Sequence, residues 1–298
     1  MTEHDQLAER FEAHRSRLRS VAYRMLGSLS EAEDAVQEAW LRLSRADASE
    51  IDNLGGWLTT VVGRLCLDML RARTSRREDP LDAHVPDPII RPIGREDETP
   101  EAEAMLADSV GLALLVVLDK LDPAERLAFV LHDVFGMPFE EIAPIVDRSI
   151  VATRQLASRA RRRVQGQAPA FEGDLRQQRR VIDAFLGAVR DRDFEGLMSV
   201  LDPGIVLRAD GGAAASLTRV VRGAREVAGQ AAGFSKLVAN QIVLVNGSIG
   251  LLARRPDGQL FAVIGLTIAD GRIAEMNILA DPDRLGRLDL SALDAVPP

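Results

Sequence analysis

The segment from Leu121 to Val164 constrains the fold more than any other part of the chain. It is typical of a helix, a second short helix, a tight turn and a final arginine-rich helix. Asp122 can cap the first helix, Pro123 suits its first position, and Glu125 completes a capping box. Ser149 is a natural N-cap for the last helix. This layout predicts a DNA-reading helix-turn-helix, with the last helix in the major groove.

The last helix separates into an inward and an outward face. The inward positions recur at helical spacing and are Thr153, Ala157, Ala160 and Val164. The outward positions are Val151, Gln155, Ser158 and Arg162, with Arg154 and Arg159 beside them and Arg161 and Arg163 placed to hold phosphates. Gln can pair with adenine and Arg with guanine. The alternative is a solvated basic helix that ends a bundle, but the absence of any acid between Ser149 and Gln165 favours DNA.

Composition limits how the chain could meet DNA and where it works. The net charge is −8 across 298 residues, so contact with DNA must be local. Cys66 is the single cysteine, and the four histidines have no metal-ligand spacing, so we expect no disulfide, metal or cofactor. The N-terminus is polar and no apolar run approaches about 20 residues. We therefore expect a cytoplasmic protein without a membrane span.

The first 80 residues are expected to be helical, and one helix has an unusual outer face. Ser30 and Glu33 predict the capping box that opens it, and its buried stripe is Ala32, Val36, Ala39, Trp40 and Leu43. Its outer face carries Asp34, Gln37, Glu38 and Leu41. Carboxylates repel phosphates, so DNA is excluded as the partner of this face. A solvated surface and a basic protein partner are both open.

The next helix is expected to start near Leu54 and to end in a basic cluster. The predicted inward residues are Trp57, Leu58, Val61, Leu65 and Met69, with Thr59, Thr60 and Arg64 off that stripe. We interpret Trp57 as a core residue rather than a base-stacking one. The preceding loop, residues 52–56, is polar enough to approach a base.

Three segments in this order carry a resemblance to the bacterial extracytoplasmic-function (ECF) sigma factors, the smallest promoter-specificity subunits of RNA polymerase. They are AEDAVQEAWLRL at 32–43, GWLTTVVGRLCLDMLRAR at 56–73, and the helix-turn-helix. Within the last segment, Asp147 stands where glycine is usual, which Asp tolerates in a left-handed conformation. Pro144 predicts a short or bent second helix.

The resemblance implies a partner for each segment. Core RNA polymerase would be bound at the clamp helices of its β′ subunit by Asp34, Gln37, Glu38 and Leu41, and at the β flap by the helix-turn-helix domain. The −10 element of promoter DNA would be contacted by Asn53, Thr60, Arg64, Arg71, Arg73, Arg76 and Arg77. The −35 element would be contacted by Ser149, Arg154, Gln155, Ser158, Arg159 and Arg162.

The chain is expected to contain three domains and an intervening linker. Residues 1–77 form the sigma region 2 domain, 78–104 an acidic Pro-rich linker, 105–166 the region 4 domain, and 175–290 a further domain. The linker is either a passive tether or an acidic segment that imitates nucleic acid in a polymerase channel, since sigma linkers of this class resemble such mimics.

The further domain shows an amphipathic helix over 177–191, a strand-like 206–210, a helix-compatible 223–234 and strand candidates at 237–246, 250–271 and 272–282. Hairpin turns are expected at Pro256-Asp257-Gly258 and Asp270-Gly271. Helices followed by a curved antiparallel sheet resemble the SnoaL-like, nuclear-transport-factor-2-like cone, whose sheet wraps a pocket. The fold class is thus two all-α sigma domains followed by an α+β cone.

Sigma factors with such an added domain form a subgroup, and two motifs support membership. Asp210-Gly211-Gly212 resembles its aspartate-glycine motif, and Asp281-Pro282-Asp283-Arg284-Leu285 resembles its C-terminal motif. The subgroup's linker motif contains a tryptophan, whereas this chain has residues 84–88, HVPDP. We expect these residues to make regulatory contacts, either docking on the sigma core or sensing a small molecule in the pocket.

The function expected from this is an alternative sigma factor without catalytic activity. The alternative is a SnoaL-like cyclase or isomerase, with Asp210 as acid or base, tethered to DNA by its helical half. Against it, Asp-Gly-Gly is usually a turn, and all four histidines precede residue 133. A repressor that uses the helix-turn-helix alone would leave the first 80 residues unexplained.

Overall fold

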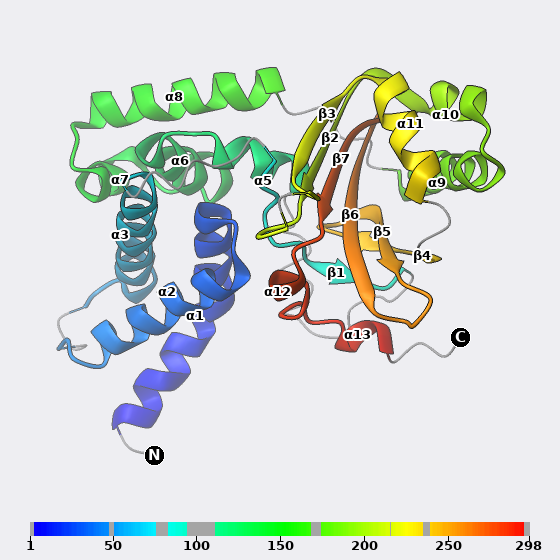
Figure 1. Cartoon of the computed structure of the whole chain (residues 1–298). Helices are drawn as coiled ribbons and strands as arrows, with labels where there is room; N and C mark the ends of the chain where they lie inside the picture. Colours follow the sequence, from blue (N-terminus) through cyan, green and yellow to red (C-terminus); the bar gives the residue numbers. More distant parts are fainter. Residues whose placement is uncertain are drawn as a thin grey trace. The chain divides into compact units, whose positions relative to one another are not determined.

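The computed structural model describes residues 3–47, 51–75, 83–93, 111–167, 174–214, 216–234 and 239–294. It divides into two compact units (Figure 1). The first contains Met1–Asp79, Glu98–Asp108 and Val117–Gln167. The second contains Pro80–Asp97, Ser109–Val116 and Ala168–Pro298. Part of the predicted linker therefore belongs to the C-terminal unit.

The first unit begins with three helices, α1 (Glu3–Leu26), α2 (Leu29–Leu43) and α3 (Leu54–Ser75). Gly27 ends α1 with φ of 70°, a conformation that glycine adopts at little cost. The next residue, Ser28, is the N-cap of α2, and its hydroxyl accepts from the Glu31 N–H at 3.5 Å. The predicted cap at Ser30 is wrong, because the chain re-enters the helix two residues earlier.

The buried face of α3 differs from the predicted stripe. Its buried residues are Leu54, Leu58, Thr59, Val62, Gly63, Cys66, Leu67 and Leu70, so only Leu58 of the predicted set is fully buried. The helix contacts α1 and α2 and also two later helices, α6 (Pro123–Phe129) and α7 (Phe139–Val146), so more than one of its faces is covered. Burial raises the pKa of the Cys66 thiol to about 12, which leaves it unreactive near neutral pH.

The helix-turn-helix has the predicted form. It comprises α6, the π-helical turn η2 (Val130–Val134), α7 and α8 (Ile150–Gln167). Asp122 caps α6 by accepting from Ala124 N at 3.0 Å, and Ser149 Oγ accepts from Ala152 N at 3.2 Å, so both predicted caps are confirmed. Asp147 takes the left-handed conformation, with φ 56° and ψ 53°, directly after the short α7 that contains Pro144.

Arg126 joins this domain to α1. Its side chain is buried, and it donates to Asp119 Oδ1 at 2.9 Å and to the Arg24 carbonyl at 3.0 Å. Burial lowers the pKa of Arg126 and the Asp119 carboxylate opposes that shift. A buried charge is stable only with its partners in place, so Arg126 fixes how the helix-turn-helix packs against α1.

α5 (Leu112–Asp119) precedes α6 in the chain.

The second unit is a seven-stranded sheet with helices against it. Its helices are α9 (Leu175–Asp191), α10 (Phe194–Val200), α11 (Ala224–Phe234), α12 (Pro282–Leu285) and α13 (Ser291–Asp294). Its strands are β1 (Ile90–Arg91), β2 (Leu201–Asp210), β3 (Arg219–Arg222), β4 (Ala239–Val245), β5 (Ser248–Arg254), β6 (Leu260–Ala269) and β7 (Arg272–Leu279). The order is β1-β4-β5-β6-β7-β2-β3.

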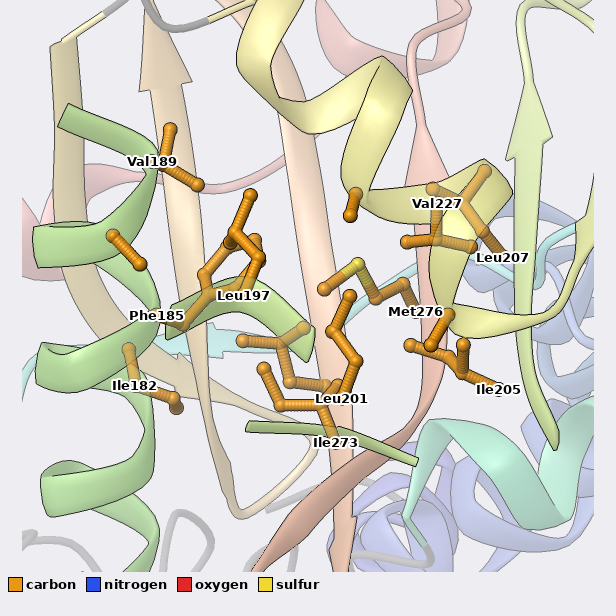
Figure 2. Packing of buried hydrophobic residues seen from close by; sticks show 14 of the residues in the cluster. Ile182, Phe185, Val189, Leu197, Leu201, Ile205, Leu207, Val227, Ile273 and Met276 are labelled. Atoms are coloured by element: carbon orange, nitrogen blue, oxygen red, sulfur yellow. The ribbon is translucent and has the colours of Figure 1, made fainter. Parts of the chain in front are cut away.

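Neighbouring strands are antiparallel, except that β2 and β7 run parallel. The expected hairpin at Asp270-Gly271 is present, with φ of 51° and 70° as a type I′ turn requires. A second such turn at Asn246-Gly247, φ 49° and 78°, joins β4 to β5. Hydrophobic side chains from α9, α10 and α11 pack with those of the sheet into one core (Figure 2). The α+β cone is therefore confirmed.

Candidate functional site

The outer face of α2 is exposed as predicted. Asp34 and Gln37 are exposed, and Leu41 keeps 38% of its surface accessible. Glu38 is half-buried and accepts from Arg42 Nε at 3.0 Å. An apolar side chain among acids thus faces outward, while the predicted inward residues Ala32, Val36, Ala39 and Leu43 are buried and Trp40 is half-buried.

The loop before α3 forms a shallow depression. It is lined by Ala46, Asp47, Ile51, Asp52, Asn53 and Trp57. Trp57 is half-buried and lines this depression, so its interpretation as a core residue is only partly confirmed. Asn53 caps α3 by accepting from Gly56 N at 3.0 Å, which fixes the loop and leaves its NH₂ group as a donor.

The remaining residues predicted for the −10 element divide into three groups. Thr60 is half-buried, and Arg71 is exposed, 3.9 Å from Asp68. Arg64 donates to the Pro144 carbonyl at 3.4 Å, and Arg73 is held by an ion pair with Glu31 and a hydrogen bond to the Leu26 carbonyl. Arg76 and Arg77 lie outside the described residues.

The outward face of α8 is exposed as predicted, but part of its positive charge is paired with acids. Thr153, Ala157 and Ala160 are buried, and Val164 is half-buried, so the predicted inward face is largely confirmed. Gln155, Ser158 and Arg162 are exposed along one row, together with Val151 at 65%. The Arg162 side chain makes no hydrogen bond or ion pair within the part of the chain that the structure describes.

Other arginines of α8 pair with acids of the same domain. Arg159 and Arg163 donate to the two carboxylate oxygens of Glu125, each at 2.7 Å. Arg161 pairs with Asp133, and Arg154 lies 3.5 Å from Glu140. Glu125 is buried and its oxygens face α8, so its predicted place in a capping box is wrong.

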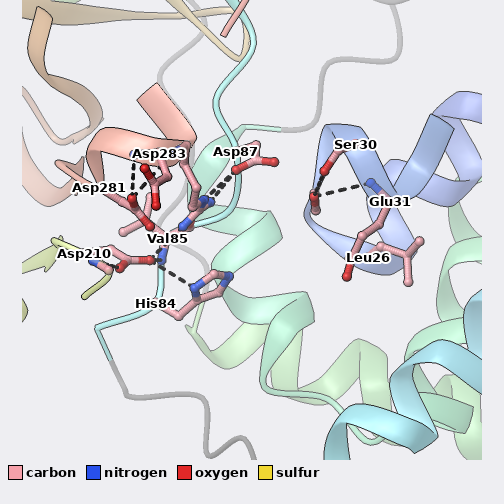
Figure 3. A network of polar contacts seen from close by, with 12 residues as sticks. Leu26, Ser30, Glu31, His84, Val85, Asp87, Asp210, Asp281 and Asp283 are labelled. Atoms are coloured by element: carbon pink, nitrogen blue, oxygen red, sulfur yellow. Dashed lines mark hydrogen bonds and ion pairs between the residues drawn. The ribbon is translucent and has the colours of Figure 1, made fainter. Parts of the chain in front are cut away.

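In the C-terminal unit, Asp210 holds the linker at the end of β2 (Figure 3). Its Oδ2 atom accepts from Val85 N at 3.1 Å, lies 3.0 Å from His84 Nδ1, and accepts from Arg284 Nη1 at 2.8 Å. Its Oδ1 atom accepts from Gly212 N at 3.0 Å. Burial opposes ionisation of Asp210, but bonds from His84, Val85 and Gly212 lower its pKa to about 2.

Arg284 completes this set of contacts. Its Nη2 atom donates to the Val85 carbonyl at 2.6 Å, and its Nε atom to Asp87 Oδ1 at 2.8 Å. Asp281 caps α12 by accepting from the N–H groups of Asp283 and Arg284, and Pro282 occupies the first turn. The short helix therefore aims Arg284 at the linker. We call His84, Val85, Asp87, Asp210 and Arg284 the linker clamp.

The two glycines after Asp210 stand where there is no room for a side chain. A Cβ on Gly212, whose φ is 56°, would lie 2.2 Å from Asp281 Oδ2. A Cβ on Gly211 would lie 2.5 Å from Leu217 Cβ and 2.8 Å from the Ala214 carbonyl oxygen. The aspartate-glycine motif and the C-terminal motif are thus packed against each other, which any side chain would prevent.

The linker also extends the sheet. Ile90 and Arg91 pair antiparallel with Val245 and Leu244 of β4. Asn246 anchors the entry to this pairing, because its Oδ1 accepts from Ile89 N at 3.0 Å and its N–H donates to the Ile89 carbonyl at 2.8 Å. Sequence reasoning missed Asn246 and β1, although the Asn-Gly pair was a turn signal.

The geometry of Asp210 bears on the enzyme hypothesis. Asp210 does not line the cavity of the cone, whereas its neighbour Ala209 does. A carboxylate with a pKa of about 2 and three donors on one oxygen is a weak base. Its contacts are those of a docking residue.

Comparison with known proteins identifies the family of this chain. The Sigma-70 region 2 family matches residues 10–76, and the Sigma-70 region 4 family matches residues 111–164. The ECF RNA polymerase sigma factor SigJ of Mycobacterium tuberculosis is 37% identical over 288 residues, covering 92% of this chain and 91% of that protein. The chain belongs to the ECF sigma factor family.

Other relatives agree with this membership. The probable ECF RNA polymerase sigma factor SigI of Mycobacterium tuberculosis is 37% identical over 97% of this chain and 98% of its own length. The crystal structure of Mycobacterium tuberculosis SigJ superposes with a TM-score of 0.75 at 34% identity, over 95% of this chain and 99% of that one. These relatives are sigma factors, and the matches cover nearly the whole length of each of them. The enzyme alternative is therefore not favoured.

Among the helices in the described part of this sigma factor, none is long and apolar enough to cross a membrane.

We predict that the Asp210 carboxyl titrates near pH 2 in the folded protein and that His84→Ala moves its pKa up toward 3.8. Because the folded pKa lies below the unfolded one, the contribution of this group to folding is complete above about pH 4 and falls as the pH drops toward 2. Carboxyl ¹³C NMR measures the titration, with Asp210→Asn to assign the signal. A wild-type midpoint at or above 3.8 would contradict the hydrogen bonding described here.

Proposed function

We propose that this chain is an alternative sigma factor that brings core RNA polymerase to promoters with defined −10 and −35 elements. The observation that carries the proposal is family membership over nearly the whole chain, with regions 2 and 4 in order. The faces described above supply the surfaces that the activity needs. The chain is proposed to have no catalytic activity of its own.

The polymerase contact is assigned to the outer face of α2. Asp34 and Glu38 give this face negative charge, and Leu41 is an exposed apolar side chain on the same face. An interface commonly combines an apolar anchor with a charged rim that steers the partner. A basic helical surface such as the β′ clamp helices fits this pattern, whereas DNA does not.

The DNA contacts are assigned to two separate surfaces. The depression beside Asn53 and Trp57 offers amide donors and an aromatic face to an unstacked base of the −10 element. The row on α8 offers Gln155, Ser158 and Arg162 to the major groove of the −35 element. Arg159 is 45% exposed but pairs with the buried Glu125, so we propose that the row makes the main base contacts.

The two sigma domains must separate to use these surfaces together. A Cβ on Gly63 of α3 would lie 3.5 Å from a methyl carbon of Leu127 and 3.6 Å from Ile145, so regions 2 and 4 are in direct contact. Elements named −10 and −35 are about 25 base pairs apart, or roughly 85 Å of B-DNA at 3.4 Å per base pair. We therefore regard the described arrangement of regions 2 and 4 as a closed state.

The linker clamp is proposed to control this opening. The linker joins region 2 to region 4, and its residues 83–93 are held by Asp210, Arg284, Asn246 and the β1–β4 pairing. A linker held on the cone cannot extend between separated domains or enter a polymerase channel. The C-terminal domain thus acts as a regulator that restrains the linker until it is released.

We predict that Leu41→Arg weakens binding to core RNA polymerase about 10-fold or more, since it places a cation on an acidic, apolar contact surface. Leu175→Arg is the matched control, because Leu175 is 40% exposed at the start of α9, outside the sigma domains. Affinity is measured by titration of labelled protein with core enzyme, and melting curves check the fold. Equal affinities for both variants and the wild type would refute the assignment of α2.

Arg162→Ala is expected to weaken binding to DNA that contains the −35 element by about 1–3 kcal/mol, if its guanidinium reads a base. Arg180→Ala, an exposed arginine on α9, is the control. Fluorescence anisotropy with matched and scrambled −35 sequences separates base reading from phosphate contact. An equal loss on both sequences would make Arg162 a phosphate contact.

Arg284→Leu is expected to raise transcript yield by freeing the linker, while Arg287→Leu, an exposed arginine three residues later, leaves it unchanged. In vitro transcription with core enzyme on a library of promoter fragments measures both. Transcripts that share −10 and −35 sequences test the sigma function, and the ratio between variants tests the clamp. No transcript from any variant would overturn the sigma function; equal yields would overturn only the regulation.

A further inference from the structure

The cone of the C-terminal unit contains a cavity of about 120 Å³ that the linker clamp does not use. Phe185 and Val189 of α9, Leu207 of β2 and Met276 of β7 form part of its wall (Figure 2). The cavity is separate from the clamp residues, since none of His84, Val85, Asp87, Asp210 or Arg284 lines it.

Small side chains keep this space open. Alanine occupies five wall positions, at 209, 231, 253, 262 and 280, on four different strands or strand ends and on α11. Ala209, Ala253, Ala262 and Ala280 are themselves buried, so larger side chains at these positions would fill the cavity rather than reach solvent. A void in a core costs stability, and its wall is almost entirely apolar, so water gains few partners there.

Among the described residues, one hydrogen-bond acceptor in the wall lacks a donor. Gln230 of α11 lines the cavity, and its Oε1 atom is buried without a hydrogen bond to any described residue. A buried acceptor that has left water without a replacement costs free energy, so such atoms are usually satisfied. A donor on a bound molecule would satisfy it. The other polar residues that line the cavity are Asn240, which is exposed, and Arg219.

We propose that this cavity binds a small, largely apolar molecule with one ring and one hydrogen-bond donor, of the phenol class, whose hydroxyl donates to Gln230 Oε1. The volume limits the ligand to about one ring, because an apolar cavity of about 150 Å³ accommodates benzene and this one has about 120 Å³. The single unpartnered acceptor decides the polar group. This inference concerns the ligand alone and does not depend on the sigma function.

The Met276 methyl group provides a local probe of binding. Met276 is buried in the cavity wall, whereas Met25 lies in the core of the first unit, so the two report on different places. Full-length protein labelled with ¹³C at the methionine methyl groups is titrated with phenol and with toluene, which has nearly the same shape but no donor. Met276→Leu assigns the signal. Phenol is expected to move the Met276 signal with a Kd of about 0.1–1 mM, and to leave Met25 unchanged.

Two variants separate the predicted contacts from non-specific binding. Gln230→Leu removes the acceptor and is expected to weaken phenol binding about 3- to 10-fold without weakening toluene binding. Ala262→Leu fills the cavity and is expected to abolish both, whereas Ala239→Leu, on an exposed position of β4, changes neither. A Met276 signal that neither compound moves at about 10 mM overturns the proposal. It is likewise overturned if Ala262→Leu leaves binding intact, or if Gln230→Leu affects phenol and toluene equally.

Discussion

The guanidinium of Arg284 is the contact on which the organisation of the C-terminal unit depends. It lies between the carboxylates of Asp210 and Asp87 and also donates to the Val85 carbonyl. Burying such charges is costly, and only well-placed partners compensate. The linker therefore has one favourable position on the cone, and β1 pairs with β4 in a single register because Asn246 fixes the residue before it.

The alternation of side chains along a strand separates the two sites of the cone. On β2, Ala209 lines the cavity while the next residue, Asp210, holds the linker. At the end of β7 the chain repeats this arrangement, with Ala280 in the cavity wall and Asp281 capping the helix that carries Arg284. The sheet thus keeps its carboxylate away from the apolar interior, which suits docking rather than acid–base chemistry.

Charge pairing inside region 4 decides how much of α8 is available to DNA. A buried Glu125 requires compensation, and Arg159 and Arg163 supply it from the same helix that was expected to read bases. The exposed side chains outside these ion pairs include Gln155, Ser158 and Arg162. The helix is consequently less basic toward its outer face than its composition implies, which agrees with a chain whose net charge is −8.

The sequence by itself determined the features that depend on neighbouring residues. Caps at Asp122 and Ser149, the turn at Asp147 and the exposed face of α2 follow from hydrogen bonds and helical periodicity within a few residues. Only the tertiary structure decided which face of α3 is buried, because helices far along the chain cover it. The linker clamp is equally non-local, since Arg284 and Asp87 meet across 197 positions of the sequence. No local sequence pattern can predict a contact between residues so far apart in the chain. The pairing exists because the parallel strands β2 and β7 bring Asp210 and α12 to one end of the sheet.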